Sequence, residues 1–145
     1  FSILSGYLAA LRSARSHIYL ENQFLWSPEV TDVLVDKLLH PPSDLFRLLL
    51  VLPRRPNNGS DTTRGQLARL IAADAGHGRL LATTMVGPTR QSPGVYVHAK
   101  IGIVDDRWMT IGSANLNEHS LFNDTEVNVL TLDEDLARTT RLRLW

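Results

Sequence analysis

The side chains best suited to chemistry lie close together in one stretch of the sequence. His98 and Lys100 stand two residues apart in a run rich in Val and Ile, which is typical of a β-strand. Residues i and i+2 of a strand point to the same side, so both side chains and Tyr96 are expected on one face. Free imidazole titrates near neutral pH and suits a nucleophile or a general acid, while lysine offers a positive charge. The pattern predicts chemistry on an anionic group.

The residues that follow add hydrogen-bond donors to this pair. Segment 105–107 has the composition of a turn, and segment 108–111 predicts a second strand that returns beside the first as a hairpin. The hairpin ends at Gly112, after which Ser113 and Asn115 can project together. Hydroxyl and amide donors beside a lysine would hold the non-bridging oxygens of a phosphodiester.

This pattern resembles the HKD signature of the phospholipase D superfamily. The resemblance rests on three residue types at two fixed gaps and on a Gly-Ser-x-Asn element: His98, Lys100, Asp105, Gly112, Ser113 and Asn115. Residues 18–24 are similar to the strand and turn that precede the motif in the carboxy-terminal half of two-motif members. Residues 113–117 and 124–126 are similar to the downstream run, so the resemblance covers essentially the whole chain. One departure is visible, because many relatives have arginine where this chain has His119.

The resemblance implies a two-step displacement at phosphorus. One histidine attacks and forms a phosphohistidine, a second histidine from another HKD motif protonates the leaving alcohol, and water or another alcohol then releases the phosphoryl group. The single motif would supply half of a site, completed by a second HKD half in the same chain or by a homodimer mate. The likeness of residues 18–24 to a carboxy-terminal half favours His98 as the general acid, with the nucleophile as the alternative. The resemblance implies that no metal or other cofactor is required.

Two acidic residues are expected to have different roles. Glu126 lies in a predicted strand, and it is the candidate to hold the second ring nitrogen of His98. Asp105 stands an odd number of positions from Lys100, so an unbroken strand would turn it away from the site. We therefore expect Asp105 to have a structural role at the turn, although the motif is partly named after it.

Two loops supply further candidates. Glu21, Asn22 and Gln23 follow a predicted strand, where α/β folds often place ligands, so they are candidates for substrate binding, with loop packing as the alternative. Arg54 and Arg55 could meet a headgroup or a phosphate, although a solvated loop is the simpler interpretation. The sequence contains no metal-binding constellation.

The elements that must position these residues alternate between helix and strand. The spacing of apolar residues predicts helices over 2–14, 27–40, 63–75, 116–121 and from 133 onward. It predicts strands over 17–20, 45–52, 80–86, 95–104, 108–111 and 125–132, with a loop over 87–94. This order predicts an α/β fold. The resemblance implies that its form is the phospholipase D-like one, a mixed β-sheet flanked by helices.

Bulk properties limit the class of protein. The chain has 145 residues, 43% of them hydrophobic, which fits one globular domain over residues 1–145. Fifteen basic and fifteen acidic residues cancel, so bulk charge does not favour nucleic acid as the partner. No cysteine is present, and neither a signal peptide nor a long apolar run is visible. Because the chain begins at a residue other than Met, we expect it to be a piece of a longer protein.

These observations predict an enzyme that cleaves phosphodiesters or transfers phosphatidyl groups. Phospholipid is favoured over nucleic acid as the substrate, and a transient contact with a membrane surface is expected. Two alternatives stay open: a nuclease-type phosphodiesterase that works as a homodimer, and a non-catalytic binding module on the same fold.

Overall fold

The computed structural model describes residues 2–89 and 94–145, so residues 90–93 of the expected loop lie outside the described part. The strands are β1 (His17–Asn22), β2 (Arg47–Val51), β3 (Leu80–Thr83), β4 (Lys100–Val104), β5 (Trp108–Gly112) and β6 (Asn128–Thr131). The helices are α1 (Ile3–Ser13), α2 (Pro28–Leu39), α3 (Ser60–Asp74), the π-helical turn η1 (His119–Asn123) and α4 (Glu134–Leu144). None of the described helices is long and apolar enough to span a membrane.

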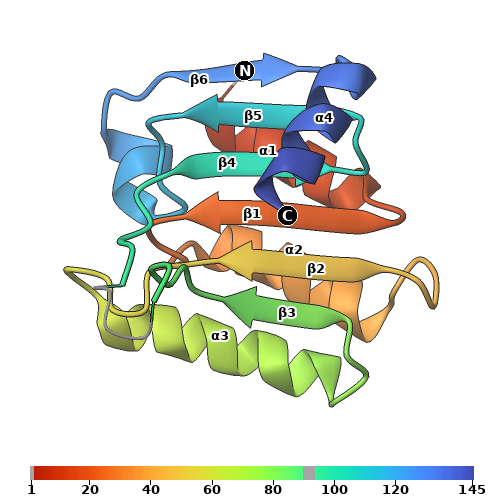
Figure 1. Cartoon of the computed structure of the whole chain (residues 1–145), viewed down its shortest axis with the longest axis horizontal. Coiled ribbons are helices and arrows are strands. Elements are labelled where there is room, and N and C mark those ends of the chain that lie inside the picture. Colours follow the sequence, from red (N-terminus) through yellow and green to blue (C-terminus); the bar gives the residue numbers. More distant parts are fainter. Residues whose placement is uncertain (1, 90–93) are drawn as a thin grey trace.

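The described strands form a single sheet in the order β3-β2-β1-β4-β5-β6 (Figure 1). β1 pairs in parallel with β2, and β2 pairs in parallel with β3. The pairs β1–β4, β4–β5 and β5–β6 are antiparallel. The predicted mixed sheet and the predicted hairpin of β4 and β5 are therefore confirmed.

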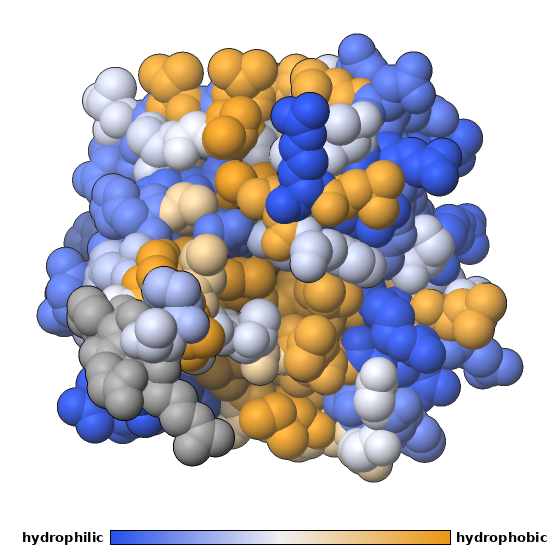
Figure 2. Space-filling model, viewed as in Figure 1, coloured by the Kyte–Doolittle hydropathy of each residue, from blue (hydrophilic) through white to orange (hydrophobic). Residues whose placement is uncertain are grey.

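Helices cover the two faces of the sheet unequally. α1 and α2 lie behind the sheet in Figure 1, and α4 crosses in front of it. The larger core forms between α1, α2 and α3 and one face of β1 and β2, with these fully buried members: Leu11, Ile18, Leu20, Leu34, Leu48, Leu50 and Leu70. A smaller cluster on the front face joins Tyr19, Ile103 and Met109 to Ala137 of α4. Below α4, apolar side chains remain at the surface (Figure 2), and Leu81 of β3 is 55% exposed.

Local sequence signals explain where several elements begin and turn. Ser27 accepts a hydrogen bond from the backbone N–H of Val30 at 3.3 Å, and Pro28 occupies the first position of α2, as expected for this helix start. Asp105 and Asp106 both have positive φ angles, 53° and 55°. A tight hairpin turn with the twist of the flanking strands needs this conformation, which Asp tolerates better than most residues.

Several strand boundaries differ from the prediction: β1 extends beyond residue 20 to Asn22, and β3 ends at Thr83 instead of 86. Two further differences, at the starts of β4 and β6, affect the site. The strand expected over 95–104 begins only at Lys100, because β1 ends at Asn22, the residue that pairs with Lys100. His98 therefore precedes the strand, where β1 no longer pairs with it. β6 begins at Asn128, so Glu126 also lies outside the ladder. The helix expected over 116–121 is instead the π-helical turn η1.

Candidate functional site

The candidate residues meet at one edge of the sheet, on the left in Figure 1. β1 and β5 end at this edge, whereas β4 and β6 begin there. The alternation of strand directions therefore places the start of the HKD segment, the segment after Gly112 and the segment before β6 beside one another. The antiparallel register sets this arrangement, because Asn22 pairs with Lys100 and Gly112 pairs with Asn128.

Lys100 is the buried charge of the site. The residue is only 6% exposed. Its Nζ donates to the Gln23 side-chain oxygen at 3.1 Å and to the His98 carbonyl at 2.7 Å. An ammonium has three donors, so one N–H has no partner among the described residues. Burial lowers the pKa of Lys100, and the negative charge of Glu126 opposes this effect. A buried cation with a spare donor is suited to an anionic ligand.

His98 is exposed, in contrast to Lys100. Its carbonyl is held by Lys100, and its ring makes no hydrogen bond within the described residues. The expected partnership with Glu126 is therefore not found: the Glu126 carboxylate accepts a hydrogen bond from the Ser113 hydroxyl instead. The reason is the late start of β6, which leaves Glu126 in the connecting segment beside Ser113.

Ser113 and Glu126 form a hydrogen-bonded pair. The Ser113 oxygen also accepts from the backbone N–H of Val127 at 3.0 Å, so the hydroxyl serves the segment before β6 and does not donate to the site as expected. Hydrogen bonds from Ser113 and Ser120 lower the pKa of Glu126, and the positive charge of Lys100 adds to this effect. An ionised carboxylate therefore lies within electrostatic range of the lysine.

Gly112 and Asn115 frame the same turn. A Cβ atom at Gly112 would lie 2.3 Å from both the Val127 carbonyl oxygen and the Asn128 side-chain oxygen, so only glycine allows this approach. Asn128 in turn accepts from the backbone N–H of Ala114 at 3.2 Å. Asn115 is half-buried, and its side-chain oxygen has no partner among the described residues.

The three candidates expected after the first strand divide into two kinds, because β1 extends through Glu21 and Asn22 and only Gln23 follows it. Glu21 is buried and accepts from the Tyr19 hydroxyl at 2.8 Å. Asn22 is buried as well, and its oxygen accepts from the N–H groups of Phe24 and Leu116 at 3.1 and 3.2 Å. The contacts of Asn22 tie the sheet to the neighbouring loops. Of the three, Gln23 is the residue whose side chain bonds to Lys100.

Comparison with known proteins identifies the family of the chain. A sequence model of the family described as "Cardiolipin synthase, PLD-like domain" matches residues 7–143. The chain belongs to the phospholipase D-like superfamily of phosphodiesterases. Phospholipase D2 of Bos taurus is 31% identical over 93% of this chain and 19% of its own length. Phospholipase D zeta 1 of Arabidopsis thaliana is 31% identical over 94% of this chain and 16% of its own length. The chain therefore spans less than a fifth of these relatives.

Two solved structures share the fold. NucT from Helicobacter pylori matches with a TM-score of 0.74 and 15% identity, over 97% of this chain and 83% of that chain. Nuc from Salmonella typhimurium, described as a phospholipase D family member, matches with a TM-score of 0.68 and 22% identity, over 94% and 80% of the two chains. At these identities the likeness shows the fold alone.

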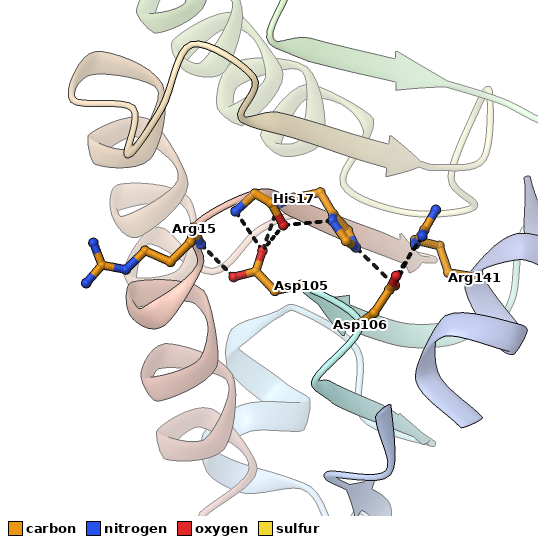
Figure 3. A network of polar contacts seen from close by, with 6 residues as sticks. Arg15, His17, Asp105, Asp106 and Arg141 are labelled. Atoms are coloured by element: carbon orange, nitrogen blue, oxygen red, sulfur yellow. Dashed lines mark hydrogen bonds and ion pairs between the residues drawn. The ribbon is translucent and has the colours of Figure 1, made fainter. Parts of the chain in front are cut away.

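The aspartate of the motif lies at the opposite end of β4 in this phospholipase D-like domain (Figure 3). Its carboxylate accepts from the backbone N–H groups of Arg15, Ser16 and His17 at 2.6, 2.8 and 2.8 Å, and from the Ser16 hydroxyl at 2.8 Å. Burial opposes ionisation of Asp105, but these hydrogen bonds outweigh it and hold its pKa below the ordinary range. The expected position at the turn is confirmed, and the contacts join α1 and β1 to the hairpin.

Asp106 extends this cluster to the last helix. It accepts two hydrogen bonds of 2.6 Å from Arg141 of α4, and His17 lies 3.1 Å away (Figure 3). The hydrogen bond from Arg141 lowers the pKa of Asp106, although burial opposes it. Sequence reasoning left His17 without a role and missed Arg141, because no spacing rule links residues so far apart in the chain.

The sequence also did not reveal a chain of side-chain hydrogen bonds beside Lys100. Gln23 donates to the Tyr96 hydroxyl at 3.1 Å, and Tyr96 donates to the Asn57 side chain at 3.0 Å. Strand alternation placed Tyr96 on the Lys100 face, which was the available signal, but nothing in the sequence pointed to Asn57. Within residues 2–89 and 94–145, no group of three or more His, Asp and Glu side chains is arranged to hold a metal ion.

Proposed function

We propose that this domain cleaves a phosphodiester in the manner of a phospholipase D and hydrolyses or transfers a phosphatidyl group through a phosphohistidine intermediate. One observation carries the proposal: the buried ammonium of Lys100 keeps a spare donor and binds the backbone carbonyl of His98, whose exposed ring makes no hydrogen bond among the described residues. A buried cation with an unused donor costs a fold free energy, whereas a phosphodiester would use both this ammonium and the exposed imidazole.

Lys100 and Asn115 provide the anion-binding step. The buried ammonium would bind one non-bridging oxygen, and its interaction is strengthened by exclusion of water. The side-chain oxygen of Asn115 has no partner among the described residues, and the amide N–H groups of the same side chain would donate to the phosphoryl group. Ser113 contributes indirectly, because its bonds to Glu126 and Val127 hold the turn before Asn115 in place.

His98 would act as the general acid, with the nucleophile as the alternative role. In the first step, a histidine nitrogen from a second motif bonds to phosphorus, the bond to the leaving alcohol breaks, and His98 donates a proton to the leaving oxygen. In the second step, His98 takes a proton from water or another alcohol, whose oxygen displaces the phosphohistidine nitrogen. Gln23 would be a positioning residue, because it contacts Lys100 and not the reacting atoms.

The domain would supply half of a two-motif site. It carries one HKD motif and spans less than a fifth of the phospholipases it resembles. The second half would come from the same chain or from a second copy about a two-fold axis. The exposed apolar surface at β3, which includes Leu81, supports this arrangement, since such surfaces commonly mark an interface with another domain or subunit.

Turnover by the full-length protein tests the proposal. We expect release of the headgroup from phosphatidylcholine or cardiolipin, and loss of this activity in His98→Asn. His77→Asn is the matched control, because His77 is also exposed and lies after α3. Cleavage of plasmid DNA alone would support the nuclease alternative. Equal turnover by His98→Asn and the unmodified protein would support the binding-module alternative.

Rapid quenching at alkaline pH, where a phosphorus–nitrogen bond to histidine survives, assigns the role of the imidazole. With substrate labelled at phosphorus, a general-acid role predicts that the label is trapped on the second motif and that His98→Asn slows its formation. Label on the peptide containing His98 would make His98 the nucleophile.

A further inference from the structure

A large groove opens beside the candidate site. It has a volume of about 1010 Å³ and is lined by the loops that follow β2 and β3 and by the segment that leads into β4. Small-molecule pockets measure on the order of 300–1,000 Å³, so the groove is large for one compact ligand. The groove lies at the same edge of the sheet as His98, because β1, β2 and β3 all end there and the segment before β4 joins its lining.

The described lining of the groove combines cations with exposed apolar side chains. Arg54 and Arg55 are exposed, and no described lining residue is acidic. Among the other lining residues Val86 is 77% exposed, Met85 45% and Val95 43%. Exposed apolar groups gathered at one edge of a soluble fold indicate an interaction surface, and adjacent arginines make it complementary to an anion.

Tyr96 connects this surface to the site. Its ring is at the surface, with the residue 44% exposed, while its hydroxyl is held by Gln23, which also contacts Lys100. An aromatic ring with an anchored polar end is the side chain enriched at membrane interfaces. Two hydrogen bonds of 3.1 Å, both made by the Gln23 side chain, thus connect Tyr96 at the surface to the buried ammonium of Lys100.

We infer that the groove loops dock this domain on an anionic lipid surface. Arg54 and Arg55 meet the lipid phosphates, while Val86, Met85 and Tyr96 enter the interfacial layer. A polynucleotide would use the arginines but would gain little from aliphatic side chains. The inference extends the proposed function, since a lipid phosphodiester has to be reached at a membrane.

Vesicle binding by the full-length protein tests this inference. In a sedimentation assay, we expect the protein to bind vesicles of phosphatidylcholine and phosphatidylglycerol with higher affinity than vesicles of phosphatidylcholine alone. Arg54→Ala/Arg55→Ala should weaken binding to the anionic vesicles about 30-fold, because each cation contributes at the surface. Val86→Asp should weaken it about tenfold or more. The matched controls are Arg12→Ala/Arg143→Ala and Leu45→Asp, exposed positions outside the groove, which should bind within about twofold of the unmodified protein.

A soluble substrate separates this inference from the proposed function. The groove variants should hydrolyse bis(p-nitrophenyl) phosphate within about twofold of the unmodified rate, because their folds and their His98 environment are unchanged. Vesicle binding without turnover of any diester would retain the docking surface and remove the proposed function. Unchanged vesicle affinity in both groove variants would overturn the inference. Loss of single-stranded DNA binding in those variants, without any vesicle binding, would also overturn it.

Discussion

The two ends of β4 handle charged groups in opposite ways. At the end that leads into the turn, the Asp105 carboxylate accepts four hydrogen bonds, and Asp106 is bound by both Arg141 and His17. At the other end, the ring of His98 has no hydrogen bond among the described residues, and Lys100 keeps a spare donor. Satisfied polar groups stabilise a fold, whereas a buried donor without a partner costs free energy. One short strand thus carries a structural end and an end whose side chains remain available to a ligand.

Removing the buried charge should have the largest effect. In Lys100→Met, we expect turnover of a phosphodiester by the full-length protein to fall about 10³-fold, because the phosphoryl group loses its main cation. The melting temperature should fall little, since burial disfavours the charged form that is removed. Steady-state kinetics and calorimetry check both outcomes. If Lys100→Met retained more than a tenth of the activity, Lys100 would have no special role in turnover, and the contrast between the two ends of β4 would fail.

Neutralising the turn aspartate should produce the complementary result. Asp105→Asn keeps the size and the positive φ angle but weakens four hydrogen bonds to a charge, so the free energy of unfolding should fall by about 2 kcal/mol. Turnover below the melting temperature should stay within about twofold. Urea denaturation provides the measurement, and a loss of turnover in fully folded Asp105→Asn would contradict the structural assignment.

The stability lost in Asp105→Asn should depend on pH. The pKa of Asp105 in the folded state lies below its ordinary value, so its ionisation stabilises the fold above that ordinary value. The advantage over Asp105→Asn should be complete at neutral pH and should disappear as the pH falls through the folded-state pKa. Denaturation curves at neutral and acidic pH check the sign. A gap that widens on acidification would exclude this cause.

Changing the residue that orients the lysine should have an intermediate effect. Gln23→Met removes the oxygen that accepts from Lys100 at 3.1 Å, and we expect kcat to fall about tenfold. The ammonium loses a favourable dipole, so the alkaline decline of the pH–rate profile should move to lower pH. Leu45→Met is the control for a distant methionine. A fall in kcat with an unmoved pH profile would mean that Gln23 acts only through packing.

Releasing the last helix should have the smallest effect. Arg141→Leu removes the paired hydrogen bonds to Asp106, and the free energy of unfolding should fall by about 1 kcal/mol, with turnover unchanged. Arg138→Leu, an exposed position on the same helix, should change stability by less than about 0.5 kcal/mol. Equal effects of the two substitutions would show that the cluster contributes no more than a surface charge.

Much of the fold was predictable because local patterns and tertiary structure agree. The start of α2 at Pro28 and the hairpin of β4 and β5 follow from short-range signals, whereas the mixed sheet was expected from the family resemblance. The prediction was wrong where a strand depends on the length of its neighbour. β4 could not extend to His98, because its partner β1 ends at Asn22.

The sequence by itself determined which side chains are available for chemistry and in what order they follow one another. Residue type and spacing along one hairpin are local properties, so His98, Lys100 and the turn at Asp105 could be recognised from them. Only the tertiary structure decided their partners, because sheet register brings together residues that are distant in the chain. Register placed Gln23 against Lys100 and Ser113 against Glu126, and it left the ring of His98 open at the edge of the sheet.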